Sequence, residues 1–372
     1  MPMPFIMLLA GAAMPADGPP PPPMVLTVPA PPVGPRNRVL ISWTPGDVRC
    51  AGAVVRGGVV RRPLGNLSYN EPRVVPVTYG FRIDASGRPL SLAREGEASP
   101  FGHDVAPALA ASRFRKGAAR EDCSVTYTPR VWGMNFVPIE DLVSYTITPT
   151  SVPLPREGWE QIRAGGKCWD APAPQALLRA YPDFRKIAGT PGVKDWVLVG
   201  YDTDQNGVPT NMRTMHTTGN AVLDAAGAKA VGDSRFTGGA RKGCLYPYWK
   251  VAARLPAPPV PDEADYRSGE QGCAVKPKWN SRPVLVFPDA WRRRSIEGWA
   301  IVRYDVAPWG GVGNVKVLAS QPAEDFGRQA ISIVQSGRAV ASPQGATGCL
   351  ETVRFVLGRS EREQAENAPE SF

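Results

Sequence analysis

The side chains that most often carry out hydrolysis or hold metal ions are scarce in this sequence. Its 372 residues include two histidines, His103 and His216, which occupy unrelated places in the chain. Neither has a recurring neighbour that could act as a nucleophile beside a positioned base. The cysteines stand too far apart for a zinc site. We therefore predict no catalytic residue, no metal site and no cofactor, and we do not expect an enzyme.

One short motif is similar to half of a calcium-binding loop. Asp202-Thr203-Asp204-Gln205-Asn206-Gly207 has the spacing D-x-D-x-N-G, but the twelfth position, which requires a glutamate, is Arg213. Aspartate, asparagine and glycine are also the residues of tight turns. A turn between two strands is the favoured interpretation, and calcium binding is the alternative.

The six cysteines have a regular spacing. In sequence order they form pairs that are 73, 76 and 76 residues apart, namely Cys50 with Cys123, Cys168 with Cys244, and Cys273 with Cys349. The spacing favours three disulfides, each closing a loop whose constraint is worth roughly 4 kcal/mol in the chain-entropy estimate. Such bonds persist in an oxidising compartment. The alternative is six reduced, buried thiols in the cytosol.

The equal spacing reflects three related segments of the chain. Residues 79–87 match residues 199–207, and residues 302–310 match both more loosely. Trp196 and Trp299 hold the same place in the second and third segments. These matches predict three tandem modules.

Each segment has the same order of expected elements. Alternating apolar residues predict a half-buried first strand, followed by a glycine-containing turn, a second strand, an alanine-rich helix and a last strand. This order predicts an α+β fold in which each module is a small antiparallel sheet of about three strands with a helix packed on one face. The expected inward faces are Val77, Tyr79, Phe81 and Ile83; Val197, Val199 and Tyr201; and Ala300, Val302, Tyr304 and Val306.

The expected domain boundaries follow from the repeats and from proline-rich stretches. Residues 138–155 and 255–261 are the expected connectors. The chain then divides into a signal-like segment 1–16, a proline-rich extended segment 17–39, modules at 40–135, 160–252 and 268–358, and a flexible tail 359–372.

The first sixteen residues resemble a secretory signal peptide. Apolar residues 5–14 precede small residues, although the usual basic start is missing. Either the true start lies upstream, with or without a membrane anchor, or the signal is atypical; an ordinary apolar N-terminus is the third interpretation. Ten apolar residues reach roughly 15 Å, about half of a bilayer core, so this stretch is not expected to form a transmembrane helix. The expected location is the periplasm.

The formal charge of +9, from 43 basic and 34 acidic residues, raises the question of nucleic-acid binding. The basic residues are dispersed, and the densest run, Trp291-Arg292-Arg293-Arg294, is expected on a helical turn. We interpret this run as a solvated basic face and expect no nucleic-acid partner. A weak, salt-dependent attraction to an anionic envelope membrane is compatible with the charge.

Four motifs of the third segment share their order and spacing with a known family. They lie at 287–290 (Phe-Pro-Asp-Ala), 296–306, 313–322 and 326–330. Together they resemble the C-terminal domain of TonB-type energy transducers, and the other two segments resemble it more faintly. The resemblance implies a periplasmic module that binds outer-membrane receptors by adding a strand from the receptor to its own sheet edge.

The resemblance also implies which strand forms that edge. The expected partner-binding residues are Leu350, Glu351, Thr352, Val353, Arg354, Phe355, Val356 and Leu357. The expected partner is a protein, such as a TonB-dependent outer-membrane receptor, and the expected role is support of TonB-dependent transport. Membrane association would come from an upstream anchor or from the partner. The alternative is a structural envelope scaffold of disulfide-stabilised repeats, in which this strand is paired within the chain or shielded.

Overall fold

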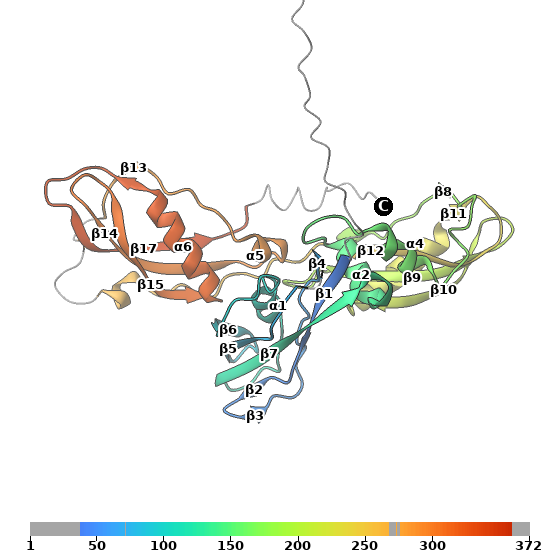
Figure 1. Ribbon diagram of the computed structural model, residues 1–372, viewed down its shortest axis with the longest axis horizontal. Helices are drawn as coiled ribbons and strands as arrows, with labels where there is room; N and C mark the ends of the chain where they lie inside the picture. Colours follow the sequence, from blue (N-terminus) through green and yellow to red (C-terminus); the bar gives the residue numbers. More distant parts are fainter. Residues whose placement is uncertain (1–37, 71, 268–272, 274–275, 359–372) are drawn as a thin grey trace, which may run out of the picture. The chain divides into compact units, whose positions relative to one another are not determined.

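The computed structural model describes residues 38–70, 72–267, 273 and 276–358 (Figure 1). The signal-like segment 1–16, the tail 359–372 and residues 17–37 of the proline-rich segment lie outside these residues, so what we expect of them stays a prediction. Residues 38 and 39 begin the first strand instead of extending the proline-rich segment. The described residues fall within one compact unit of the chain.

The fold is α+β and consists of small antiparallel sheets with few helices. The first sheet has seven strands, more than the sequence predicts, because β7 is long enough to pair with β5 along one part and β1 along another. Helix α1 (Val105–Ala110) follows β6. The strands are β1 (Arg38–Pro45), β2 (Arg49–Cys50), β3 (Ala53–Val54), β4 (Asn66–Tyr69), β5 (Val77–Ile83), β6 (Pro89–Glu95) and β7 (Arg120–Gly133).

The segment expected to be the first connector is folded. Proline residues predicted a connector over 138–155, but α2 (Ile139–Ile147) occupies half of it, and α3 (Arg156–Arg163) follows. The buried residues Leu142 and Val143 explain the helix, because they give α2 an apolar face, and Pro138 precedes its first turn, where a missing N–H does no harm. A short 3-10 helix, η1 (Met134–Phe136), links β7 to α2.

The second sheet has three strands in the order β10-β9-β12, with α4 after β10. Val197, Val199 and Tyr201 of β9 are buried, and Leu223 of α4 belongs to the same hydrophobic core. The elements are β8 (Ala176–Leu178), η2 (Phe184–Lys186), β9 (Asp195–Thr203), β10 (Pro209–Thr217), α4 (Ala221–Asp233), β11 (Arg235–Phe236) and β12 (Arg241–Lys250), with β8 and β11 forming a separate pair.

The third sheet has the order β15-β14-β17, and α6 packs against β14 and β15 (Figure 1). Tyr304 and Phe326 lie in a core that also contains Phe81 and Leu109 of the first sheet and its helix, so these two sheets share buried surface. The elements are η3 (Glu263–Tyr266), β13 (Trp279–Ser281), α5 (Asp289–Arg293), β14 (Gly298–Val306), β15 (Val312–Gln321), α6 (Glu324–Ser336), β16 (Arg338–Ala339) and β17 (Ala346–Phe355), with β13 and β16 paired.

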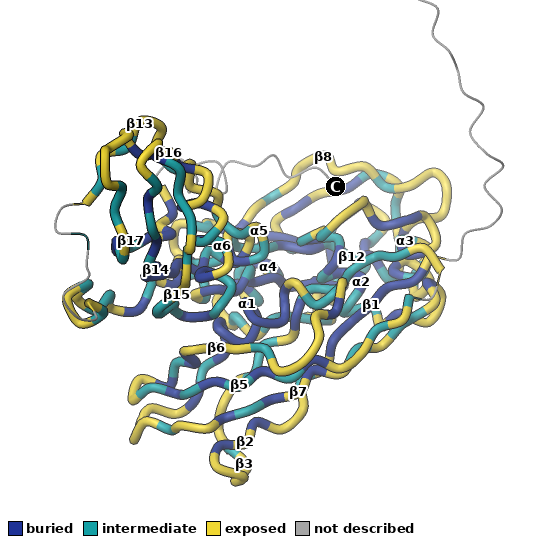
Figure 2. The backbone as a smooth tube through the Cα atoms, turned by 60° about the vertical axis from the view of Figure 1, so that its left-hand side comes forward, coloured by how far each residue is buried: buried dark blue, intermediate teal, exposed yellow. Residues whose placement is uncertain are grey.

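Buried residues line the inner strands of all three sheets, whereas turns such as the one between β2 and β3 are exposed (Figure 2). The alternation expected for the first strand is clearest in β5, where Val77, Tyr79, Phe81 and Ile83 are all buried. Among the helices of the described residues, none has the length and apolar character needed to cross a membrane.

Candidate partner-binding edge

Strand β17 forms one edge of the third sheet. It pairs with β14 from Gly298–Phe355 to Tyr304–Cys349 without a shift in register, and its other side pairs with no strand in the described part of the chain. An unpaired side of this kind presents a row of backbone N–H and C=O groups to an extended partner. The geometry therefore suits strand addition.

The strand differs in extent from the eight residues expected to form the edge. It begins at Ala346 and ends at Phe355, so Val356 and Leu357 lie beyond it. The backbone N–H of Leu357 donates to the carboxylate of Glu297, 2.9 Å away, which is almost fully buried. Leu357 is thus held inside the fold and offers no donor to a partner.

Apolar side chains fix β17 to the body of the sheet. Leu350, Val353 and Phe355 are buried, and the ring of Phe355 meets that of Phe326 on α6 with centroids 5.1 Å apart. Arg354 is exposed, while Glu351 and Thr352 are half-buried. A partner would therefore meet a rigidly held strand with a polar outer border.

The corresponding strand of the first sheet is not free in this way. Strand β7 has β5 on one side and β1 and β2 on the other. The opposite border of the third sheet is also partly covered, because Leu92 of β6 donates its N–H to the carbonyl of Pro322, just after β15, at 2.9 Å. Strand β17 thus pairs with a strand on one side only in the described part of the chain, whereas β7 is paired on both sides.

A side chain from η3, which follows the second connector, lies against this edge. The carboxylate of Glu263, in η3, accepts hydrogen bonds from the Thr352 hydroxyl at 2.7 Å and from the Lys276 ammonium at 3.0 Å. Burial raises the pKa of Glu263, but these two hydrogen bonds, the positive charge of Lys276 and the backbone N–H of Thr352 together outweigh it, so the pKa lies below its usual value. Glu263 is therefore held as a carboxylate at the edge.

The surroundings of Glu263 form a pocket of about 600 Å³ between the connector and β17, lined by Val260, Pro261, Asp262, Glu263, Lys276, Glu351, Thr352 and Arg354. Lys276 lies between two carboxylates, since its ammonium is also 3.8 Å from Glu351. Burial raises the pKa of Glu351, with Lys276 opposing and Glu263 reinforcing the shift. The pocket contains the hydrogen-bonding groups that a partner strand would have to replace.

The connector itself is anchored to the third sheet. Leu255 exchanges backbone hydrogen bonds with Ser295 and Glu297, and Trp299 donates its indole N–H to the carbonyl of Pro258 at 3.0 Å. No local pattern in the sequence could have found Glu263 or Lys276, because both come from stretches without strand or helix periodicity.

The six cysteines form three disulfides, and the partners are those that the spacing favours: Cys50–Cys123, Cys168–Cys244 and Cys273–Cys349. Cys349 lies within β17, three residues before Thr352, so its disulfide ties the edge strand to residue 273. Strand β17 is thereby fixed both by side-chain packing and by a covalent bond.

The calcium-like motif forms the turn between β9 and β10. The carboxylate of Asp204 accepts hydrogen bonds from the backbone N–H groups of Asn206 and Val208, both at 2.9 Å, and Gly207 has a positive φ of 73°. The motif thus has a structural role in this turn. In the residues that the structure describes, no cluster of three or more His, Cys, Asp or Glu side chains could hold a metal ion.

Residues 298–355 form a small antiparallel sheet with one helix on a face. Its last strand pairs with a strand on one side only in the described part of the chain. Residues 283–357 match the family model described as Gram-negative bacterial TonB protein C-terminal, which supports a TonB C-terminal domain in this part of the chain. Protein TonB of Klebsiella pneumoniae is 33% identical over 81 residues, 22% of this chain and 33% of that protein. The chain thus spans about a third of the length of this curated relative. These similarities support a TonB-like C-terminal domain within a longer chain.

Proposed function

We propose that this chain is a periplasmic, TonB-like protein that binds an extended segment of an outer-membrane receptor by adding it to β17, and that it thereby supports TonB-dependent transport. One observation carries the proposal: the unpaired side of β17 lies within the residues that match the TonB C-terminal family. Backbone hydrogen bonds along an edge supply affinity, and neighbouring side chains supply specificity.

We further propose that the second and third sheets are tandem copies of one module. In the second, Asp202 accepts from Asn211 at 3.0 Å and from the N–H of Gly243 at 2.9 Å. In the third, Asp305 accepts from Asn314 at 2.7 Å and from the N–H of Gly348 at 2.8 Å. Both asparagines have positive φ, and so does Ser91 at the matching place in the first sheet. The shared network supports a common origin of the second and third sheets, and the shared positive φ extends this proposal to the first sheet.

The second candidate function is an envelope scaffold without a strand partner. The observation that favours it is the contact between Glu263 and Thr352, which already fills part of the edge. The two candidates differ in whether β17 meets another protein in the cell.

Site-specific photo-crosslinking in intact cells tests the proposal. A probe at Arg354 stands on the exposed part of the edge, and a probe at Val317 of β15, on the opposite strand of the same sheet, is the matched control. We expect Arg354, and not Val317, to crosslink to an outer-membrane receptor. Crosslinks confined to this chain, from protein that is folded and exported, would support the scaffold instead.

A further inference from the structure

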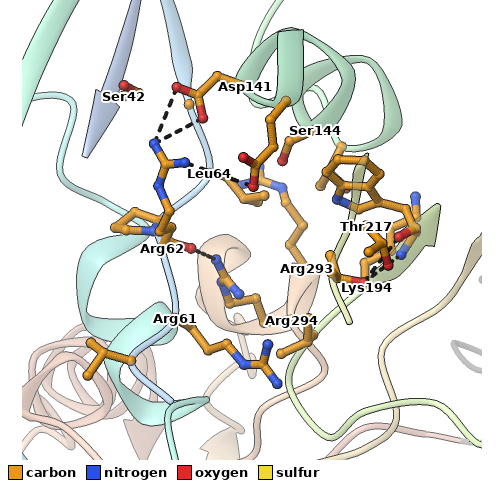
Figure 3. Close-up of a pocket in the computed structure, with 18 of the residues that line it drawn as sticks. Ser42, Arg61, Arg62, Leu64, Asp141, Ser144, Lys194, Thr217, Arg293 and Arg294 are labelled. Carbon is orange, nitrogen blue, oxygen red and sulfur yellow. Dashed lines mark hydrogen bonds and ion pairs between the residues drawn. The ribbon is translucent and has the colours of Figure 1, made fainter. Parts of the chain in front are cut away.

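A second pocket, of about 230 Å³, is lined by five cationic side chains (Figure 3). Arg61 and Arg62 precede β4, Lys194 immediately precedes β9, and Arg293 and Arg294 lie at the C-terminal end of α5. The pocket shares no residue with the pocket at β17, so the inference below is independent of strand addition.

Two of the five cations have carboxylate partners. Arg294 is buried and makes a bidentate pair with Asp104. Arg62 pairs with Asp141 at 3.0 Å and, at 4.0 Å, with Glu140. These two arginines are therefore largely neutralised within the protein.

The other three cations form no ion pair with any described residue. Lys194 donates to the carbonyl of Ile147 at 2.8 Å, and Arg293 is exposed on the last turn of α5. Asp195 lies near enough to Arg61 to act on it electrostatically, but its carboxylate already accepts hydrogen bonds from Thr190 and Asn220. No carboxylate of the described residues thus forms an ion pair with Arg61, Lys194 or Arg293, while the ammonium of Lys194 also lies over the ring of Trp249, 5.6 Å from its centroid.

Arg61 also has an unmet hydrogen bond. Its Nε is buried and has no acceptor among the described residues, which is a costly state for a charged donor. Burial lowers the pKa of Arg61, with Asp195 opposing and Arg294 reinforcing the shift, and burial lowers that of Lys194 to about 8. A bound anion would supply an acceptor and relieve this accumulation of charge.

We propose that this pocket binds a phosphoryl group. Five cations against Glu140 and Asp141 in the lining and against Asp104, the partner of Arg294, leave a formal charge of +2, which matches a phosphoryl group of charge about −2 better than a single carboxylate. Guanidinium groups bind phosphoryl oxygens in a bidentate manner, and the hydroxyls of Ser144 and Thr148 also line the pocket. Its volume is below the roughly 300–1,000 Å³ of sites for drug-sized ligands, so it accommodates the phosphoryl end of a ligand and not a whole nucleotide.

Calorimetric titration of the full chain with inorganic phosphate at low ionic strength tests the proposal. The double variant Arg61→Gln with Arg293→Gln removes the two unpaired guanidinium groups. The matched control is Arg292→Gln, which removes an exposed arginine of the same helix whose partner is Asp289 and which does not line the pocket. We expect the double variant to bind phosphate at least tenfold more weakly and the control to bind like the wild type.

Thermal unfolding without phosphate establishes that each variant is folded. If the double variant does not fold, Arg293→Gln alone, at an exposed position, is expected to weaken binding at least threefold.

Vesicles of phosphatidylcholine with and without phosphatidic acid distinguish a lipid headgroup from a soluble phosphate as the source of the phosphoryl group. Phosphate binding together with Arg61- and Arg293-dependent binding of phosphatidic acid vesicles indicates a lipid headgroup, and phosphate binding without vesicle binding indicates a soluble phosphate. No binding of phosphate, or equal binding by the double variant and the control, would overturn the proposal.

Discussion

The carboxylate of Glu263 accepts a hydrogen bond from the hydroxyl of Thr352 at 2.7 Å, so a residue of η3 contacts the edge strand near its middle. The backbone N–H of Thr352 also contributes to this carboxylate's lowered pKa. An incoming strand needs that same N–H, because successive N–H groups of a strand point to alternate sides and that of Thr352 points away from β14. Glu263 and a partner strand therefore compete for one donor.

The first prediction concerns this competition. Replacing Glu263 by alanine removes the competing acceptor, and we expect capture of the partner at β17 to increase about three- to tenfold, since a half-buried charged hydrogen bond is worth about 1 kcal/mol net. The measurement is the crosslink yield from the probe at Arg354. Asp265→Ala is the matched control, because Asp265 lies on the same 3-10 helix and is exposed. A lower yield for Glu263→Ala than for the control would show that Glu263 helps to bind the partner instead.

The second prediction tests backbone pairing itself. The N–H of Arg354, two residues after that of Thr352, also points away from β14, and proline is tolerated at such a position of an edge strand. We expect Arg354→Pro, without any crosslinking probe, to reduce co-purification of the partner at least tenfold while the melting temperature changes little. Arg354→Gln, which keeps the N–H and loses the charge, is expected to retain most of the binding. Equal retention by both variants would exclude strand addition.

The third prediction concerns the buried ion pair between Arg294, at the end of α5, and Asp104, which immediately precedes α1. Arg294 and Asp104 are both buried and lie 190 residues apart in the chain. Arg294→Met leaves the carboxylate buried without its cation, and we expect a loss of about 3–5 kcal/mol in the free energy of unfolding. Denaturant unfolding measures it, and Arg292→Met, at an exposed neighbour, is expected to change stability by less than about 0.5 kcal/mol. Similar small losses for both would mean that the pair contributes little.

The fourth prediction is a dependence of stability on pH. Burial lowers the pKa of Lys194 from 10.5 to about 8, so between these values the unfolded chain binds more protons than the folded chain, and the free energy of unfolding rises with pH. From pH 8 to 9.5 the rise from this lysine is expected to be about 1 kcal/mol. Above pH 10 buried tyrosines such as Tyr201, whose pKa burial raises to about 12, act in the opposite direction.

Urea unfolding of the wild type and Lys194→Met at pH 8 and 9.5 measures this difference. The variant is expected to lose the rise, because methionine keeps the apolar contacts of the lysine stem and cannot titrate. Parallel pH profiles for the two proteins would contradict a buried, proton-releasing Lys194.

The sequence by itself determined the features that depend on local pattern and regular spacing. Alternation of apolar residues located β5, β9 and β14, because successive side chains of a strand point to opposite faces, and the spacing of the cysteines indicated which would pair. Short motifs in a fixed order indicated that the third segment is similar to the TonB C-terminal domain, and residues 283–357 match the model of that family.

Only the tertiary structure decided which edges are free and which charges meet. The second half of β7 pairs with β1, some 90 residues earlier, and Glu263 of η3 contacts Thr352. Arg61, Lys194 and Arg293 converge on one pocket from three distant parts of the chain. Such contacts arise from the packing of elements against one another, and no periodicity within a single segment encodes them. The sequence thus predicted a partner-binding strand, and packing decided which side chain lies against it.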